Sequence, residues 1–334
     1  MVAFNVVEIL GVSLLLSVTA SRPMGPDTNV LQDHCQNLST CAEAHAAVQR
    51  AVVETLGNGQ ETKCMVAHRW GLGSELNQII KCATELALER NGTKFCIQYP
   101  KYWEYGVQTE KVSTMTNCSK LGCFFESLAS SSCDDQDRDD CTASEIKLNS
   151  RRAAADESTW SLSLLSIRAE ATRTIFDRPT AVQADHFQKK ASDLLGGNRD
   201  YVAAHIRWGD KLREEAQKVE APRYLEAAEK LAAKRGVSTV LILTSDPDAV
   251  RAVQDELHRN PSNLTYIYPN YYAMSSDPLD YISDIMLMTS GKGAVVTFSS
   301  NMGRLAYFLR HHSILQHQFE IVSMDEQQFS IVDH

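Results

Sequence analysis

Residues that could bind an anion follow an apolar run in the second half of the chain. The run Tyr201–Ile206 is almost entirely apolar or aromatic, and its end is crowded by His205, Arg207, Asp210 and Lys211. A continuous apolar run is typical of a buried strand in a parallel sheet. Ligands of open α/β sheets bind at the carboxyl ends of the strands. This segment therefore predicts an anion-binding edge, with a solvated charge cluster at a strand end as the alternative.

Two other apolar runs end in polar residues of the same kind. Thr244-Ser245-Asp246 follows the run Val240–Leu243, and Ser299-Ser300-Asn301 follows Ala294–Phe298. A serine at a helix start is an ordinary cap, but the N–H groups of such a start also bind phosphate. Because the carboxyl ends of parallel strands share one rim, the three segments together predict a nucleotide site. We read Asp246-Pro247-Asp248 as a helix start rather than as a metal-binding pair.

The elements that must position these residues alternate along the C-terminal half. Strands that alternate with helices of 10–15 residues predict an α/β fold with a parallel, doubly wound sheet. The expected strands are 201–207, 240–243, 264–267 and 294–298, and the expected helices are 223–234, 247–257, 280–289 and 302–310. Upstream, we expect helices at 42–56, after the glycine turn that begins at Gly71, at 160–176 and at 182–195, and a short strand at 95–97.

Composition limits the class of protein. The chain has 334 residues, enough for two domains with their own cores. Its net charge of -9 and its pI near 5.6 argue against a nucleic-acid partner, which would need a basic surface.

The N-terminal part indicates the secretory pathway. Residues 1–20 resemble a cleaved signal peptide, with a short signal-anchor as the alternative and the only expected route to a membrane. All nine cysteines lie between Cys35 and Cys141, which predicts disulfides in an oxidising compartment. The odd count leaves one thiol unpaired, and Cys82 is our candidate. We expect a lumenal Golgi or ER protein, or a secreted one. Four glycosylation sequons agree with this: Asn37, Asn91, Asn117 and Asn263.

Several motifs resemble those of the α1,6-fucosyltransferase family, which includes the core fucosyltransferase of N-glycans and the bacterial nodulation fucosyltransferases. The similarity covers roughly residues 64–310. In the second half it rests on His205-Ile206-Arg207-Trp208-Gly209-Asp210-Lys211, Thr244-Ser245-Asp246, Asp284 and the segment Thr297-Phe298-Ser299-Ser300-Asn301-Met302-Gly303-Arg304-Leu305-Ala306-Tyr307. In the first half it rests on Trp70-Gly71-Leu72-Gly73-Ser74-Glu75-Leu76-Asn77-Gln78, Phe124-Phe125-Glu126-Ser127-Leu128 and the stretch from Trp160 to Arg178-Pro179.

The resemblance implies a GT-B fold, in which two Rossmann-like domains face a cleft. It also implies an inverting glycosyltransferase that moves fucose from GDP-fucose to a hydroxyl of a glycan or glycoprotein, without a metal ion or any other cofactor. The expected divisions are a leader at 1–20, an extension at 21–60, an acceptor-side domain with disulfides at 61–196, a nucleotide-sugar domain at 197–325 and a tail at 326–334.

The resemblance also implies roles for the donor-site residues. Arg207 would hold the β-phosphate, because a guanidinium can neutralise the departing diphosphate in place of a metal ion. His205 and Asp284 would hold guanine and ribose, with Asp246 nearby. The remaining implied donor contacts are Ser299 and Ser300 on the phosphates and Arg304 as a brace of their loop.

On the acceptor side, Glu215 matches the position of the proposed general base, and Glu214 beside it is the alternative. Lys211 would orient the acceptor or tune that base, and Asp210 is counted with the catalytic residues.

The chain departs from the family at one position of the donor motif. The core fucosyltransferase has two adjacent arginines, and here the second is Trp208. The helical stem and SH3-like domain of the animal enzyme also have no counterpart. A protein O-fucosyltransferase-like enzyme, and an inactive relative that binds GDP-sugars or glycans, therefore remain alternatives. A dinucleotide-dependent dehydrogenase is disfavoured, because no G-x-G-x-x-G follows a strand.

Overall fold

The structure, a computed structural model, describes nine stretches of the chain. All of them belong to one compact unit formed by residues 33–334. The described stretches are 38–55, 62–65, 72–89, 95–98, 124–128, 164–208, 218–268, 277–310 and 319–325.

The C-terminal part is built on a five-stranded sheet whose strands are all parallel. The prediction of an α/β fold with a doubly wound parallel sheet is confirmed: the spatial order β5-β4-β3-β6-β7 places the first strand in the centre and reverses direction beside it. The last strand was not predicted. The strands are β3 Val202–His205, β4 Thr239–Leu243, β5 Thr265–Ile267, β6 Gly293–Val296 and β7 Glu320–Ser323.

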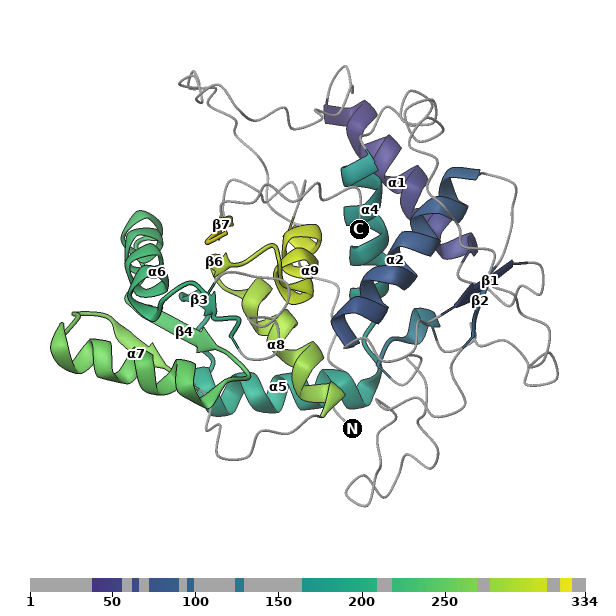
Figure 1. The fold of residues 1–334 in the computed structure, drawn as a ribbon. Coiled ribbons are helices and arrows are strands. Elements are labelled where there is room, and N and C mark those ends of the chain that lie inside the picture. Colours follow the sequence, from purple (N-terminus) through teal and green to yellow (C-terminus); the bar gives the residue numbers. More distant parts are fainter. Residues whose placement is uncertain are drawn as a thin grey trace, which may run out of the picture. The chain divides into compact units, whose positions relative to one another are not determined.

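Helices cover both faces of this sheet (Figure 1). Successive side chains of a strand point to opposite faces, so the two cores alternate along β3. Val202 and Ala204 pack against α6 (Ala221–Arg235) and α7 (Pro247–Arg259), whereas Ala203 belongs to the core that holds α8 (Pro278–Ser290) and α9 (Asn301–Arg310). The helix α5 (Ala181–Leu195) packs on α8.

Local sequence signals explain where the helices begin and end. Thr180 caps α5 by accepting a hydrogen bond from the N–H of Gln183, and Gly196 closes the helix in the left-handed conformation. Gly236 closes α6 in the same way, with φ of 67°. Asp277 caps α8 ahead of a proline in its first turn, an arrangement that suits the missing N–H of proline.

Three helices of the N-terminal part share one core with α8 and α9. They are α1 (Leu38–Thr55), α2 (Leu72–Glu89) and α4 (Leu164–Phe176), and both α2 and α4 contact α9. The remaining elements are β1 (Thr62–Met65), β2 (Phe95–Gln98), which pairs with β1 in parallel, and the 3-10 turn η2 (Glu126–Leu128). The domain boundary at 196 stays a prediction.

One cysteine prediction is wrong. Cys82 on α2 is 7% exposed and takes part in a disulfide, so its thiol is not the unpaired one. Burial alone pointed to a small apolar side chain, but a bridged sulfur is buried equally well.

The predicted leader lies outside the described residues, as do the sequons at Asn37, Asn91 and Asn117. Asn263, in the bend before β5, is exposed. Among the helices that the structure describes, none has both the length and the apolar character needed to cross a bilayer.

Candidate functional site

The sheet reverses its winding between β3 and β6. The two strands are neighbours in the sheet although Gly293 follows Val202 by about ninety residues, and the chain leaves them towards opposite edges of the sheet. In open α/β sheets, ligands bind in the crevice outside the carboxyl ends of such strands. The residues that follow His205 and Val296 therefore lie where the topology predicts a ligand.

His205 and Arg207 lie on the same side of the chain as it leaves β3. The strand alternation continues through the segment, because Ile206 and Trp208 belong to the core on the α6 face. His205 is 5% exposed, and its Nδ1 atom has no hydrogen-bond partner. Burial, aided by the Arg207 charge, lowers the pKa of His205 to about 3. The ring is therefore neutral at physiological pH, and Nδ1 is a buried polar atom for which a ligand or water would account.

Trp208 packs away from Arg207. It is 5% exposed, and its indole N–H donates to the carbonyl oxygen of Val219 at 2.8 Å. The Lys218 ammonium lies 4.0 Å from the centre of a Trp208 ring. These contacts join the two ends of the segment 209–217. Trp208 is therefore a core residue on the face opposite Arg207.

The turn between β6 and α9 is held by a carboxylate that sequence reasoning missed. Asp325, just after β7, accepts hydrogen bonds from the N–H groups of Phe298 at 2.7 Å and Ser299 at 2.6 Å. The N–H of Ser300 donates to the carbonyl oxygen of Thr297 at 3.2 Å. The N–H groups of Ser299 and Ser300 are therefore already engaged, which corrects our expectation that they form an open phosphate cradle. The predicted role of both serines as phosphate contacts now depends on their hydroxyl groups.

The start of α9 is packed closely against this turn and against α2. A Cβ at Gly303 would overlap the carbonyl oxygen of Thr297, so only glycine permits this approach. The side-chain oxygen of Asn301 accepts from Arg304 at 2.6 Å and from Asn77 of α2 at 3.3 Å. Arg304 thus lies beside the predicted loop, and Asn77 ties α2 to the same helix start.

Gly73 makes the approach of α2 possible. A Cβ at this position would overlap the hydroxyl of Tyr281 on α8 and would lie 3.0 Å from the Cβ of Asn301. The glycine turn found in the sequence therefore allows α2 to lie against both α8 and α9.

Asp246 is used as a helix cap, as its sequence context predicted. Its carboxylate accepts a hydrogen bond from the N–H of Asp248 at 2.8 Å, while its own N–H donates to the Thr244 hydroxyl at 3.1 Å. The cap orients Asp246 towards the first turn of α7. Within the described residues, no group of three His, Cys, Asp or Glu side chains is placed to hold a metal ion.

Asp284 lies in a charged cluster between α5 and α8. Its carboxylate is 2.8 Å from the ammonium of Lys190, which also contacts Asp280 at 3.0 Å, and His186 contacts Asp280 at 2.9 Å. Burial raises the pKa of Asp284 to about 6, although Lys190 opposes the rise. The structure thus places Asp284 against α5, and its predicted contact with guanine or ribose stays a prediction.

The acceptor-side predictions lie outside the described residues. Asp210, Lys211, Glu214 and Glu215 all fall in the segment 209–217. Their predicted roles therefore stay predictions. The described neighbours of that segment, Trp208 and Val219, fix only where it leaves the end of β3 and where the described chain resumes ahead of α6.

A hydroxyl at the switch point was also missed. Tyr224 on α6 lies beside the backbone of Arg207 and the Thr297 side chain, and burial raises its pKa to about 12. The hydroxyl groups of Tyr224 and Thr297 are therefore buried next to each other behind the rim of the sheet. Tyr224 lies in a helix with an ordinary amphipathic pattern, so its spacing did not indicate that its hydroxyl reaches Arg207 and Thr297.

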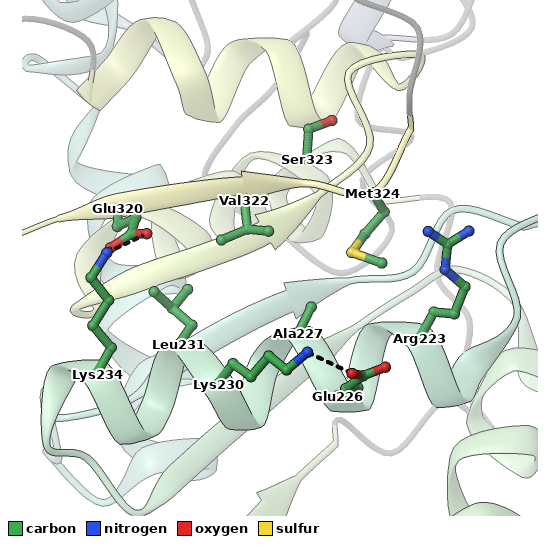
Figure 2. A pocket seen from close by; sticks show the side chains of 10 residues that line it. All are labelled: Arg223, Glu226, Ala227, Lys230, Leu231, Lys234, Glu320, Val322, Ser323 and Met324. Carbon is green, nitrogen blue, oxygen red and sulfur yellow. Dashed lines mark hydrogen bonds and ion pairs between the residues drawn. The ribbon is translucent and has the colours of Figure 1, made fainter. Parts of the chain in front are cut away.

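A separate surface hollow lies between α6 and β7, and none of the predicted site residues lines it (Figure 2). Lys230 pairs with Glu226 at 2.5 Å, and Lys234 pairs with Glu320 at 2.7 Å. An ion-paired rim over apolar residues is typical of a solvated surface. The hollow is lined by Arg223, Glu226, Ala227, Lys230, Leu231, Lys234, Glu320, Val322, Ser323 and Met324.

No protein-family model and no curated protein matches the sequence. Solved structures of three fucosyltransferases are similar to it. NodZ from Bradyrhizobium is 14% identical over 74% of this chain and 93% of that chain, with a TM-score of 0.44. A variant of FUT1 from Arabidopsis thaliana in complex with GDP is 9% identical over 81% and 76%, with a TM-score of 0.45.

POFUT1 in its apo form is 12% identical over 48% of this chain, with a TM-score of 0.35, and the chain spans about half the length of that protein. Because these TM-scores are all below 0.5, we infer the function from the residues of this chain.

Proposed function

We propose that this protein is an inverting glycosyltransferase that transfers fucose from GDP-fucose to a hydroxyl group of a glycan or glycoprotein. The observation that supports the proposal best is the switch point between β3 and β6. There, the buried neutral His205 ends β3 and Arg207 follows it, while the serine turn follows the neighbouring strand β6. The same residues carry the motifs that resemble the α1,6-fucosyltransferase family.

In the proposed reaction, the acceptor oxygen forms a bond to the anomeric carbon of fucose. The bond between that carbon and the β-phosphate oxygen breaks, and GDP leaves with the electron pair. Arg207 and the hydroxyls of Ser299 and Ser300 would bind the departing diphosphate, on which negative charge develops. Glu215, or Glu214, would take the proton of the acceptor hydroxyl, with Lys211 and Asp210 beside it.

The proposal needs no metal ion and no cofactor beyond the donor itself. A planar guanidinium can make two parallel hydrogen bonds to a phosphate, and Arg207 is held in a partly buried segment where such bonds are stronger than in water. If this is right, EDTA leaves turnover unchanged.

We extend the proposal to architecture and compartment. A second Rossmann-like domain in the N-terminal half would complete a GT-B enzyme, and the leader, cysteines and sequons support the lumen of the secretory pathway or secretion. The disulfide at Cys82 is compatible with an oxidising compartment.

Replacing Arg207 with alanine tests the donor site. We expect Arg207→Ala to lower kcat/KM for GDP-fucose by about a hundredfold to a thousandfold, the usual effect of removing one preorganised group that stabilises the transition state. The assay is GDP release in the presence of an array of glycan acceptors. Arg251→Ala is the matched control, because Arg251 is an exposed arginine of α7 paired with Asp248.

The outcomes separate the alternatives. Transfer to serine or threonine of a folded protein domain, rather than to a glycan, would indicate the O-fucosyltransferase-like activity. Saturable GDP binding without turnover on any acceptor would indicate an inactive relative. Near-native activity of Arg207→Ala would remove the basis of the proposal.

A further inference from the structure

Asp325 occupies the position that an anion would take at the turn before α9. One carboxylate oxygen accepts the N–H of Phe298 at 2.7 Å and the hydroxyl of Ser323 at 2.5 Å, and the other accepts the N–H of Ser299 at 2.6 Å. Two consecutive N–H groups that converge on one anion form a nest, the arrangement that commonly binds phosphate. In this chain the nest holds its own carboxylate.

The position of Asp325 is set by the edge of the sheet. Strand β7 pairs with β6 in parallel, and the N–H of Met324 donates to the carbonyl oxygen of Val296 at 2.8 Å. The pairing of β7 with β6 therefore places Asp325 beside the end of β6. Burial alone would raise the pKa of Asp325, but its hydrogen bonds from Ser323, Ser299 and Phe298 outweigh burial and lower it. The carboxylate is thus charged at physiological pH.

The turn is held from both sides. Asp325 holds the N–H groups of Phe298 and Ser299, while Gly303 of α9 packs directly on the carbonyl oxygen of Thr297. The N–H of Arg304 then donates to the carbonyl oxygen of Ser300 as the helix begins. The Ser299 side chain also hydrogen-bonds Asp325, and Ser300 is buried. The N–H groups of Phe298 and Ser299 are therefore not available to a ligand while Asp325 holds them.

We propose that Asp325 is a positioning residue that fixes the serine turn and fills its N–H nest, so that the donor diphosphate is not bound by the N–H groups of Phe298 and Ser299. The inference rests on the proposed function for the identity of the ligand. It deepens that function, because it removes the N–H groups of Phe298 and Ser299 from phosphate recognition and leaves that role to side chains such as Arg207. It also explains why a fixed negative charge is tolerated there, since hydrogen bonds from Ser323, Ser299 and Phe298 stabilise the carboxylate.

The test compares Asp325→Ala with Glu320→Gln. The control removes an acidic charge from β7, the strand just before Asp325, and with it only the ion pairs to Lys234 and Arg235. Amide hydrogen exchange reports the turn directly. We expect the amides of Phe298 and Ser299 to lose protection in Asp325→Ala and to keep it in Glu320→Gln. The Kd for GDP should rise roughly tenfold or more in Asp325→Ala, the loss expected from charged hydrogen bonds.

Formate provides a readout that general destabilisation would not mimic. If the nest is structural, added formate binds it in Asp325→Ala and restores both amide protection and GDP affinity, with no effect on the native protein. If GDP instead binds Asp325→Ala more tightly and formate competes with it, the nest is the phosphate site and our proposal is wrong. Unchanged amide protection in Asp325→Ala also overturns it.

A second variant keeps the test decisive if Asp325→Ala does not fold. Asp325→Asn keeps the shape and one accepting oxygen, so one of the two amides should stay protected. Should the native protein bind no GDP at all, the proposed function fails. The exchange data would still decide whether Asp325 fixes the turn.

Discussion

The placement of Trp208 predicts that it supports stability and not donor binding. Replacing it with phenylalanine removes the indole N–H that donates to the Val219 carbonyl, and that carbonyl is left buried without this partner. Losing such a bond costs about 1–2 kcal/mol. The smaller ring also leaves space in a core where every neighbour is packed, which costs about 1–2 kcal/mol more.

The expected loss is therefore about 3 kcal/mol of unfolding free energy, or roughly 4 °C in Tm for a chain of 334 residues. Urea denaturation followed by far-UV circular dichroism measures the free energy of unfolding. Isothermal titration calorimetry with GDP measures the affinity of the donor site. Tyr201→Phe is the matched control. It removes another buried donor next to β3, the hydroxyl that bonds the carbonyl oxygen of Leu287 at 2.6 Å, without touching the rim of the sheet.

We expect both variants to be less stable and both to bind GDP with native affinity. A loss of GDP affinity of tenfold or more in Trp208→Phe, with Tm near the native value, would show that the ring contacts the donor. That result would refute our placement of the Trp208 side chain on the face opposite Arg207. It would instead favour an altered or inactive donor site.

Two further predictions concern packing and charge. Gly303→Ala forces a methyl group onto the carbonyl oxygen of Thr297 and should cost at least about 3 kcal/mol by urea denaturation. Gly236→Ala should cost only about 1 kcal/mol, because it meets open space and is strained by its φ of 67° alone, and equal losses would contradict the packing argument. The pKa of Asp284 is raised to about 6, so the folded state binds the proton more tightly than the unfolded state, and stability should increase by about 2 kcal/mol as pH falls from 7 towards 4. Asp284→Asn should lack this increase in denaturation curves measured across that range, and an identical pH dependence in both proteins would argue against the assigned cause.

Much of the sheet could be predicted because its signals are local. Apolar runs marked β3, β4 and β6, and the cap Asp246 marked the start of α7 at its observed position. Strand β7 carried no such signal. It is four residues long, begins and ends in polar side chains, and forms because β6 offers an unpaired edge far earlier in the chain.

The site was less predictable than the sheet, because its contacts join distant parts of the chain. Asp325 binds N–H groups 26 and 27 residues away, and Lys190 meets Asp284 across two helices. Neither pair has a spacing that a pattern could reveal. The backbone alternation that turns Trp208 away from Arg207 was readable in principle, since it only required the strand period to continue past the rim.

The late position of β7 bears on how the protein acquires activity during synthesis. Parallel strands depend on pairings between distant segments, which form slowly. Here the final strand and the acid that follows it must arrive before the turn ahead of α9 can be locked. A nascent chain that ends after α9 therefore already contains Arg207 and the serine turn. It still lacks β7 and Asp325, which fix that turn. The proposed nucleotide-sugar binding should accordingly appear only after β7 has paired with β6.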